Sequence, residues 1–153
     1  PPVVLLVGRF GYAHQRAAAQ QGVRAQVRFI GMTQHIVDWY LAADATVLPT
    51  FYDVSSRVIY ESLIAGRPAL TTRYNGAAEA LLEQGRPVRG LVIDDPHDIP
   101  ALAQALRSLC DPQQRARMAA ACAGIAPQLA SDRHVEQIEA LLRAAHAERA
   151  QGR

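Results

Sequence analysis

Residues 45–72 read ATVLPTFYDVSSRVIYESLIAGRPALTT, and this stretch decides the fold. It begins and ends with short apolar segments, residues 45–48 and 68–72, which are typical of strands buried on both faces of a sheet. Between them, residues 55–65 have the composition of a buried helix, and Gly66 follows directly, as glycine commonly does after a helix. Because two parallel strands need a crossover connection, this order predicts a parallel strand–helix–strand unit.

The same alternation continues on both sides of this unit. Upstream, the pattern predicts a strand over residues 3–7, a helix over 13–21, a strand over 27–30 and a helix over 36–43. Downstream, it predicts a short helix 77–82, a strand 90–93, a helix 99–110 capped by Asp98, and two final helices, 115–128 and 134–149. The spacing of the last helix places five apolar residues on a buried side: Val135, Ile138, Leu141, Leu142 and Ala145. The expected fold class is α/β, a doubly wound, mostly parallel sheet with a helical C-terminus.

The composition excludes several classes of protein. The chain has 153 residues, half of them apolar and a fifth charged, so we expect one folded domain over residues 1–153. All 16 basic residues are arginine and nearly balance 14 acidic residues, which argues against nucleic acid as a partner. The absence of lysine excludes a P-loop lysine and a Schiff-base lysine. The first apolar run is too short to cross a bilayer and lacks a signal peptide's basic flank, so we expect a cytoplasmic protein.

No residue pattern indicates a metal or a dinucleotide cofactor. Cys110 and Cys122 have neither CxxC spacing nor histidines at zinc-site intervals, which fits a reducing compartment. The five histidines form no metal-binding pair. Gly8 and Gly11 are spaced differently from the glycines of a dinucleotide-binding turn. We therefore expect no metal site and no cofactor.

The loop after residue 48 is the first candidate for chemistry, because ligands of open α/β sheets bind at the carboxyl ends of the strands. Ser55 or Ser56 is expected to cap the following helix, whose unpaired N–H groups and positive dipole suit a phosphate. Arg57 lies in the first turn, where a cation is mildly unfavourable unless an anion docks beside it. An ordinary capped helix with a solvated arginine explains the same residues equally well.

Glu61 is the second candidate, since it lies within a helix that is apolar nearly all round. A carboxylate in such a helix needs polar partners or a cleft. One interpretation is that it accepts the two adjacent hydroxyls of a ribose. The other is a structural ion pair with a nearby arginine such as Arg73.

An ordered series of motifs surrounds these residues. Asp53 and Glu61 have the spacing of an acidic-x7-acidic motif, with Pro49 before it. Further segments occur in a familiar order: VRFIG 27–31, AADATVLP 42–49, ESLIAGRPA 61–69, NGAAE 75–79 and GLVIDDP 90–96. Over residues 3–118 the chain resembles the C-terminal, donor-binding domain of a GT-B retaining glycosyltransferase of the group 1 family. The resemblance implies a Rossmann-like half of a GT-B fold.

The resemblance also implies a nucleotide-sugar site. Asp53 corresponds to the acidic residue that contacts the donor sugar near the reacting carbon, and Glu61 to the one that binds the ribose hydroxyls. The diphosphate would be held by amides around Ser55, Ser56 and Arg57, and the base would lie near Gly31 and Met32, with Arg9 close enough to help. The donor would be a UDP- or GDP-sugar, bound as substrate without a metal.

The implied activity is that of a retaining hexosyltransferase whose acceptor is held by a separate N-terminal domain of a longer chain. The residues 1–153 alone are expected to bind and not to catalyse, because one domain cannot exclude water or position an acceptor. The arginines of the last helices fit either a solvated helix face or a peripheral contact with the inner face of a membrane.

The sequence departs from the family in three respects. Asp53 stands where the family commonly has a glutamate, and residues 54–56 replace a small, glycine-rich run. The strand–loop–helix unit that usually carries an arginine and a lysine for the diphosphate would precede residue 1. A catalytically degenerate binding or regulatory module of the same fold is therefore an alternative. A sugar-nucleotide epimerase or a phosphorylase is a second alternative, although the phosphorylase would need a lysine.

Overall fold

The computed structural model describes residues 2–151. The chain forms two compact units, the first extending to Trp39 and the second beginning at Tyr40.

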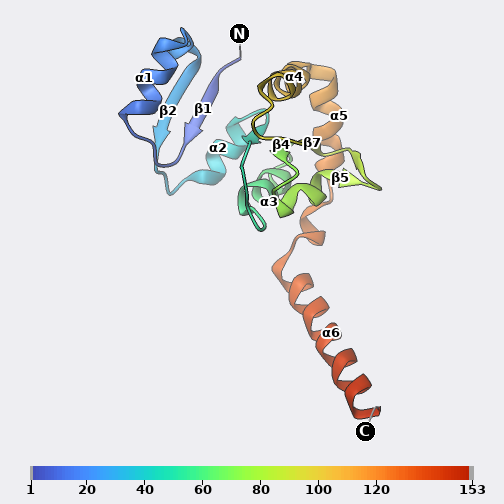
Figure 1. Ribbon diagram of the computed structural model, residues 1–153. Coiled ribbons are helices and arrows are strands. Elements are labelled where there is room, and N and C mark those ends of the chain that lie inside the picture. The colour runs from blue at the N-terminus through green and yellow to red at the C-terminus, as the bar shows by residue number, and fades with distance from the viewer. Residues whose placement is uncertain (1, 152–153) are drawn as a thin grey trace. The chain divides into compact units, whose positions relative to one another are not determined.

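The first unit is built on two parallel strands, β1 (Val4–Val7) and β2 (Val27–Gly31), which pair from Val4 opposite Val27 to Val7 opposite Gly31. Between them come α1 (Tyr12–Gln20) and a 3₁₀ turn, η1 (Arg24–Gln26). Figure 1 shows α1 beside the two strands. The predicted helix 13–21 and both predicted strands are thus confirmed to within one residue. Helix α2 (Ile36–Ala42) runs across the boundary of the two units.

The second unit contains a three-stranded parallel sheet in the order β3-β4-β7. Its elements in chain order are β3 (Thr46–Leu48), α3 (Arg57–Ile64), β4 (Ala69–Thr72), the 3₁₀ helix η2 (Gly76–Leu81) and β7 (Gly90–Ile93). Strands β5 (Leu82–Glu83) and β6 (Arg86–Pro87) form a small antiparallel hairpin between η2 and β7. The short helix predicted at 77–82 is this 3₁₀ segment. The central strand–helix–strand unit is confirmed.

Helices cover both faces of this sheet. Successive side chains of a strand point to opposite faces, so neighbouring residues of β4 pack against different helices. Ala69 of β4 packs in one apolar cluster with Ile59 and Leu63 of α3. Its neighbour Leu70 packs in another cluster with side chains of α4 (Ile99–Cys110) and α5 (Pro112–Cys122): Ala105, Leu109 and Met118. The predicted α/β fold, a mostly parallel sheet with flanking helices, is therefore confirmed.

An aspartate caps the N-terminus of each of the two helices α4 and α5. Asp98 caps α4 by accepting a hydrogen bond from the Ala101 amide at 2.8 Å, as predicted. Asp111 caps α5 by accepting from the Gln113 amide at 2.9 Å. The prediction of one helix over 115–128 was wrong at both ends. Pro112 fits the first turn, where no N–H partner is needed, and α5 ends before Gly124, whose φ is +78°.

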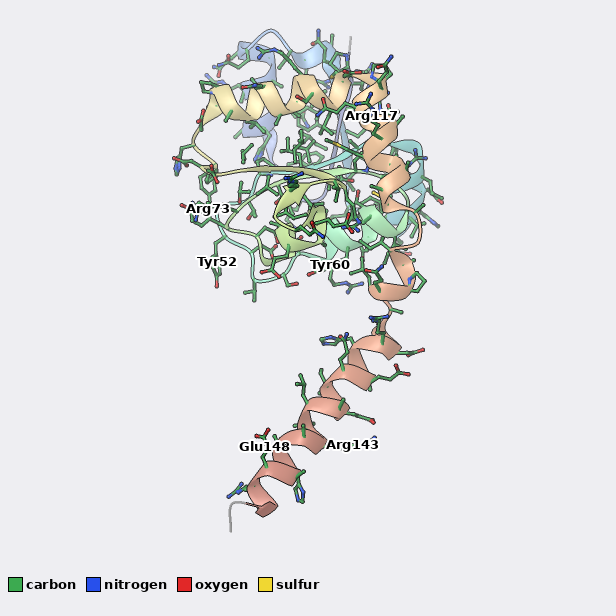
Figure 2. All side chains as sticks on the ribbon, turned by 90° about the vertical axis from the view of Figure 1, so that its right-hand side faces the viewer. Tyr52, Tyr60, Arg73, Arg117, Arg143 and Glu148 are labelled. Carbon is green, nitrogen blue, oxygen red and sulfur yellow. The ribbon has the colours of Figure 1, made fainter. Side chains whose placement is uncertain are left out.

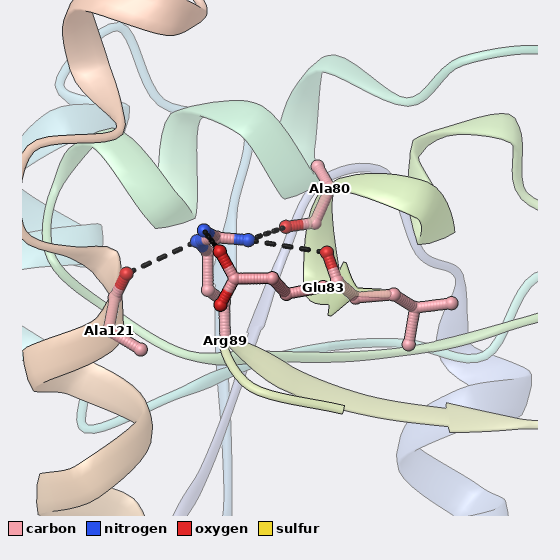
Figure 3. A network of polar contacts seen from close by, with 5 residues as sticks. Ala80, Glu83, Arg89 and Ala121 are labelled. Atoms are coloured by element: carbon pink, nitrogen blue, oxygen red, sulfur yellow. Dashed lines mark hydrogen bonds and ion pairs between the residues drawn. The ribbon is translucent and has the colours of Figure 1, made fainter. Parts of the chain in front are cut away.

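Arg89, which the sequence patterns did not single out, joins three elements of the second unit (Figure 3). Its guanidinium donates to the carbonyl of Ala121 at 3.1 Å, of Leu82 at 3.3 Å and of Ala80 at 3.4 Å. Glu83 lies 3.7 Å from the same group. A nearly buried arginine therefore satisfies carbonyls from α5, η2 and β5.

Helix α6 (Ser131–Gln151) contains the predicted final helix 134–149 and begins three residues before it, but its apolar stripe is not buried. Every side chain from residue 131 to residue 149 is exposed, and Leu141 is 71% exposed. Figure 2 shows the side chains of this helix, Arg143 and Glu148 among them. The expected burial was wrong because helical spacing shows which residues share a face and not whether another element covers it.

Candidate functional site

The candidate site lies where the loops after β3 and β4 meet. Asp53 and Asn75 form an isolated parallel bridge. The Asp53 amide donates to the carbonyl of Tyr74 at 3.1 Å, and the Gly76 amide donates to the carbonyl of Asp53 at 2.9 Å. A Cβ at Gly76 would overlap the carbonyl oxygen of Val54, so this close approach of the two loops requires glycine.

Asn75 is the buried centre of this arrangement. Its Oδ1 accepts hydrogen bonds from the amides of Ser56 at 3.2 Å and Ala77 at 3.0 Å. Its Nδ2 donates to Thr71 Oγ1 at 3.0 Å. One side chain thus fixes the entrance of α3 and that of η2. The sequence signal for it was the Asn75-Gly76 pair, which indicated a turn but not this hydrogen bonding.

The expected serine cap of α3 is wrong. Ser56 occupies the N-cap position, but its side chain accepts no capping hydrogen bond. Ser55 Oγ lies 3.1 Å from the hydroxyl of Tyr60, one turn into the helix. Asn75, from the neighbouring loop, accepts from the amide of Ser56 itself and not from an amide of the first turn of α3.

Asp53 is half-buried, and its Oδ1 accepts a hydrogen bond from the Ser55 amide at 3.0 Å. Two of the amides predicted to meet a diphosphate are therefore engaged within the chain, Ser55 by Asp53 and Ser56 by Asn75. Both lie at the positive end of the α3 dipole.

Glu61 has two partners, one on each carboxylate oxygen. The hydroxyl of Tyr40 donates to Oε2 at 3.1 Å, and the guanidinium of Arg57 donates to Oε1 at 3.1 Å. The arginine is therefore Arg57, one turn earlier on α3, and not Arg73. The Glu61 side chain is 34% exposed and that of Arg57 is 89% exposed, so this ion pair is open to solvent.

Tyr40 differs from Arg57 because only 6% of it is exposed. Burial, and then the hydrogen bond to Glu61, raise the pKa of Tyr40 well above its usual range. Its hydroxyl therefore stays protonated at any ordinary pH and remains a donor to the carboxylate. The sequence reasoning did not single out Tyr40, whose only signal was an aromatic residue on an amphipathic helix.

Aromatic side chains surround the same sheet edge. Phe51 and Tyr52, in the β3–α3 loop, are both exposed (Figure 2 labels Tyr52). The ring of Phe51 lies 4.9 Å from that of His97, which follows β7. The guanidinium of Arg73 lies 6.0 Å from the ring centre of Tyr74, in the loop after β4. The ends of all three strands thus carry exposed groups.

The remaining predicted residues lie in the first unit, at the carboxyl ends of β1 and β2. Gly31 ends β2 with a φ of +86°, and its carbonyl accepts a hydrogen bond from the Gly8 amide at 2.9 Å. Met32 and Arg9 are exposed. Asp53, residues 55–57 and Glu61 thus lie in the second unit. Arg9, Gly31 and Met32 lie in the first unit.

Residues 2–151 contain no group of three or more histidine, cysteine, aspartate or glutamate side chains placed to hold a metal ion. Within the same residues, no helix has the length and apolar character needed to cross a membrane.

Residues 2–112 match the family model described as glycosyl transferases group 1. The chain belongs to this family. The predicted membership of the group 1 glycosyltransferase family is thereby confirmed.

Relatives of known activity agree with this assignment. A D-inositol 3-phosphate glycosyltransferase of Streptomyces avermitilis is 34% identical over 113 residues, which are 71% of this chain and 23% of that enzyme. A glycogen synthase of Mycobacterium tuberculosis is 33% identical over 108 residues, 67% of this chain and 25% of the synthase. This group 1 glycosyltransferase chain thus spans about a quarter of the length of these relatives.

Solved structures share the fold. WaaG, a glycosyltransferase involved in lipopolysaccharide biosynthesis, superposes with a TM-score of 0.74 at 26% identity, covering 82% of this chain and 34% of WaaG. The Anabaena protein HepE, solved in complex with UDP, superposes with a TM-score of 0.74 at 22% identity, covering 94% of this chain and 41% of HepE. At that identity the second likeness concerns the fold alone.

Proposed function

We propose that this group 1 glycosyltransferase chain is a donor-binding domain that takes a nucleoside diphosphate sugar, UDP- or GDP-linked. The observation that carries the proposal is the Glu61 carboxylate, which is partly exposed and lies 3.1 Å from the guanidinium of Arg57, the first residue of α3. The same unit offers Asp53 at the adjoining loop. A solved structure of HepE with UDP-glucose, similar in fold, supports a UDP-sugar as the first donor to test.

The Glu61 carboxylate would bind the ribose. Two oxygens that only accept hydrogen bonds match two adjacent hydroxyls that donate. In this structure the guanidinium of Arg57 donates a hydrogen bond to Oε1, and the Arg57 side chain is largely exposed. The guanidinium would move from Oε1 to the diphosphate when the ribose arrives, because a diphosphate with two negative charges is a stronger partner for arginine than one carboxylate.

The diphosphate would lie against the positive end of α3. The Ser55 amide is now bonded to Asp53, so an Asp53 that turned toward the sugar would release this amide to a phosphate oxygen. Sugar contact by Asp53 and phosphate contact by Ser55 would thus be coupled. The Ser56 amide would stay with the buried Asn75 and support the loop.

The base would lie near Gly31 and Met32, and Arg9 would supply a further positive charge to the diphosphate. These assignments come from the family resemblance and from the position of all three residues at the ends of β1 and β2.

The proposed reaction is retaining transfer of a hexose. The bond from the anomeric carbon to the diphosphate oxygen breaks, and a bond to the acceptor oxygen forms on the same face of the sugar. The acceptor proton passes to the departing diphosphate, so this domain supplies no protein base. The α3 dipole and nearby arginines would offset the leaving-group charge, and activity without added metal or cofactor is expected.

The acceptor would be held by a separate N-terminal domain, and the 153-residue chain is expected to bind the donor without transferring sugar. We expect the protein to act in the cytoplasm, with the arginines of the last helices as a candidate contact to the inner membrane face. A degenerate binding module is the second candidate function. It is favoured by Asp53 and Val54 at positions where the family has a longer acid and a smaller residue.

Calorimetric titration with UDP, GDP, UDP-glucose and GDP-mannose tests the proposal. Binding of one nucleotide, weakened at least tenfold by Glu61→Ala, is the expected result. Asp53→Ala should remove the difference between the nucleotide and its sugar. Glu139→Ala is the matched control, because Glu139 forms a similar exposed pair with Arg143, at 2.9 Å on α6.

A folded chain that binds none of the four ligands would contradict donor binding by residues 1–153. Binding of the nucleotides with no gain from any sugar would favour the degenerate module.

A further inference from the structure

The Glu61 carboxylate accepts a hydrogen bond from a buried tyrosine, Tyr40, for which the proposed function gives no role. Tyr40, on α2, and Glu61, on α3, are 21 residues apart, and the tyrosine hydroxyl donates to Oε2 at 3.1 Å. Both residues lie in the second unit. A hydrogen bond between two helices fixes the direction of a carboxylate that would otherwise turn about its own side-chain bonds.

The two partners of Glu61 differ in how easily they can leave. Arg57 is 89% exposed, and its pair with Glu61 joins residues four apart on one helix, an arrangement worth little in water. Tyr40 is buried, so packing holds its ring in place and its hydroxyl leaves Glu61 less easily than the Arg57 guanidinium does. Oε2 thus keeps its donor and still has a second lone pair, while Oε1 is covered only by a displaceable side chain.

We infer that Tyr40 is a positioning residue for nucleotide binding: its hydroxyl holds the Glu61 carboxylate so that Oε1 and the second lone pair of Oε2 face the ribose hydroxyls. The inference rests on the proposed function, because it assumes that Glu61 binds the ribose. Its physical basis is preorganisation, since a carboxylate already fixed by one bond loses less freedom when it accepts a second.

The hydrogen bond also preserves the acceptor character of the site. The raised pKa of Tyr40 keeps its hydroxyl protonated, so the group next to Glu61 is never a second anion. A phenolate there would repel the carboxylate, and a phenylalanine would leave Oε2 without its donor.

The substitution Tyr40→Phe tests the inference, because it removes the hydroxyl and keeps the buried ring. Titrations of the chain compare UDP with 2′,3′-dideoxy-UDP, or the GDP pair if GDP is the ligand that wild type binds. We expect Tyr40→Phe to weaken UDP binding about 3- to 10-fold, which corresponds to the typical net contribution of one hydrogen bond. Affinity for the dideoxy nucleotide should not change.

Two controls separate positioning from general destabilisation. Ser62→Ala removes another buried hydroxyl from α3, one whose hydrogen-bond partners are Thr46 Oγ1 at 2.8 Å and the Arg67 carbonyl at 3.0 Å, and not the Glu61 carboxylate. It should lower the unfolding temperature without changing the ratio of the two nucleotide affinities. The stoichiometry of each titration reports the folded fraction, so misfolded Tyr40→Phe protein appears as a lower stoichiometry and not as weaker binding.

A double-mutant cycle completes the test. If Tyr40 acts through Glu61, Tyr40→Phe added to Glu61→Ala should weaken UDP binding no further. An equal loss for both nucleotides, or an additive loss in the double variant, would overturn the inference while leaving donor binding intact. Wild-type protein that binds UDP and the dideoxy nucleotide equally would instead overturn the ribose role of Glu61, and the inference with it.

Discussion

Helices α3 and α6 carry the same local feature in two different settings. In each, a glutamate and an arginine four residues apart form an ion pair, Arg57 with Glu61 at 3.1 Å and Arg143 with Glu139 at 2.9 Å. Helix α3 is packed against the sheet, and its glutamate also receives a hydrogen bond from a buried tyrosine. Every described side chain of α6 as far as residue 149 is exposed. The comparison teaches that tertiary packing, and not the ion pair, distinguishes a candidate site from a solvated surface.

The largest difference between the two helices should appear in their leucines. Leu63 of α3 is fully buried and Leu141 of α6 is mostly exposed. We expect Leu63→Ala to lower the free energy of unfolding by about 2–5 kcal/mol, because it opens a cavity. Leu141→Ala should change it by no more than about 0.5 kcal/mol. Chemical denaturation of both variants measures this, and equal losses would mean that α6 is packed in solution.

The entrance of α3 should depend on a residue outside the helix. Asn75→Ala removes the acceptor of the Ser56 and Ala77 amides within a buried region. We expect a loss of about 1–3 kcal/mol in the free energy of unfolding, the usual cost of unsatisfied buried polar groups. Asp111→Ala is the control, since it removes an exposed cap of α5 and should cost about 1 kcal/mol. An Asn75→Ala variant as stable as wild type would refute this role.

The buried tyrosine beside α3 should make the protein sensitive to alkaline pH. The usual pKa of tyrosine is 10.0, and that of Tyr40 is raised. Below pH 10 both the folded and the unfolded chain keep the proton, so the stabilisation is complete. As pH rises further, only the unfolded chain releases it, and the free energy of unfolding should fall by up to about 1.4 kcal/mol per pH unit.

Denaturation of wild type and of Tyr40→Phe between pH 8 and pH 11 measures this dependence. The variant should lose less stability above pH 10, whereas Tyr12→Phe, at an exposed tyrosine, should follow the wild type. Parallel curves for wild type and Tyr40→Phe would contradict the buried hydrogen bond.

The smallest effects should come from the two ion pairs. Arg57→Ala and Arg143→Ala should each change the free energy of unfolding by no more than about 0.5 kcal/mol, because both pairs are exposed. Only Arg57→Ala should alter ligand binding. We expect it to weaken UDP binding about threefold, because the contact with the diphosphate is lost. Binding of uridine should become slightly stronger, because Arg57 no longer covers the Glu61 carboxylate. Calorimetry with both ligands measures this, and equal behaviour of the two arginine variants would remove Arg57 from the site.

Local signals predicted most of the elements. Strand β7 and helix α4 have the predicted bounds, because a short apolar run and an aspartate cap are both local signals. Helix α5 was predicted three residues late, because Pro112 reads as a helix breaker unless it stands in the first turn. The burial of the α6 stripe was also wrong, since a sequence pattern contains no information about what covers it.

The sequence by itself determined the α/β alternation, the loop that contains Asp53 and the carboxylate of Glu61, because apolar period, glycine position and motif order are properties of neighbouring residues. Only the tertiary structure decided what those residues touch. Asn75 reaches Ser56 across 19 residues and Tyr40 reaches Glu61 across 21, by way of strand pairing and helix packing. Such contacts depend on how separate elements are brought together in space, and spacing along the chain does not encode that.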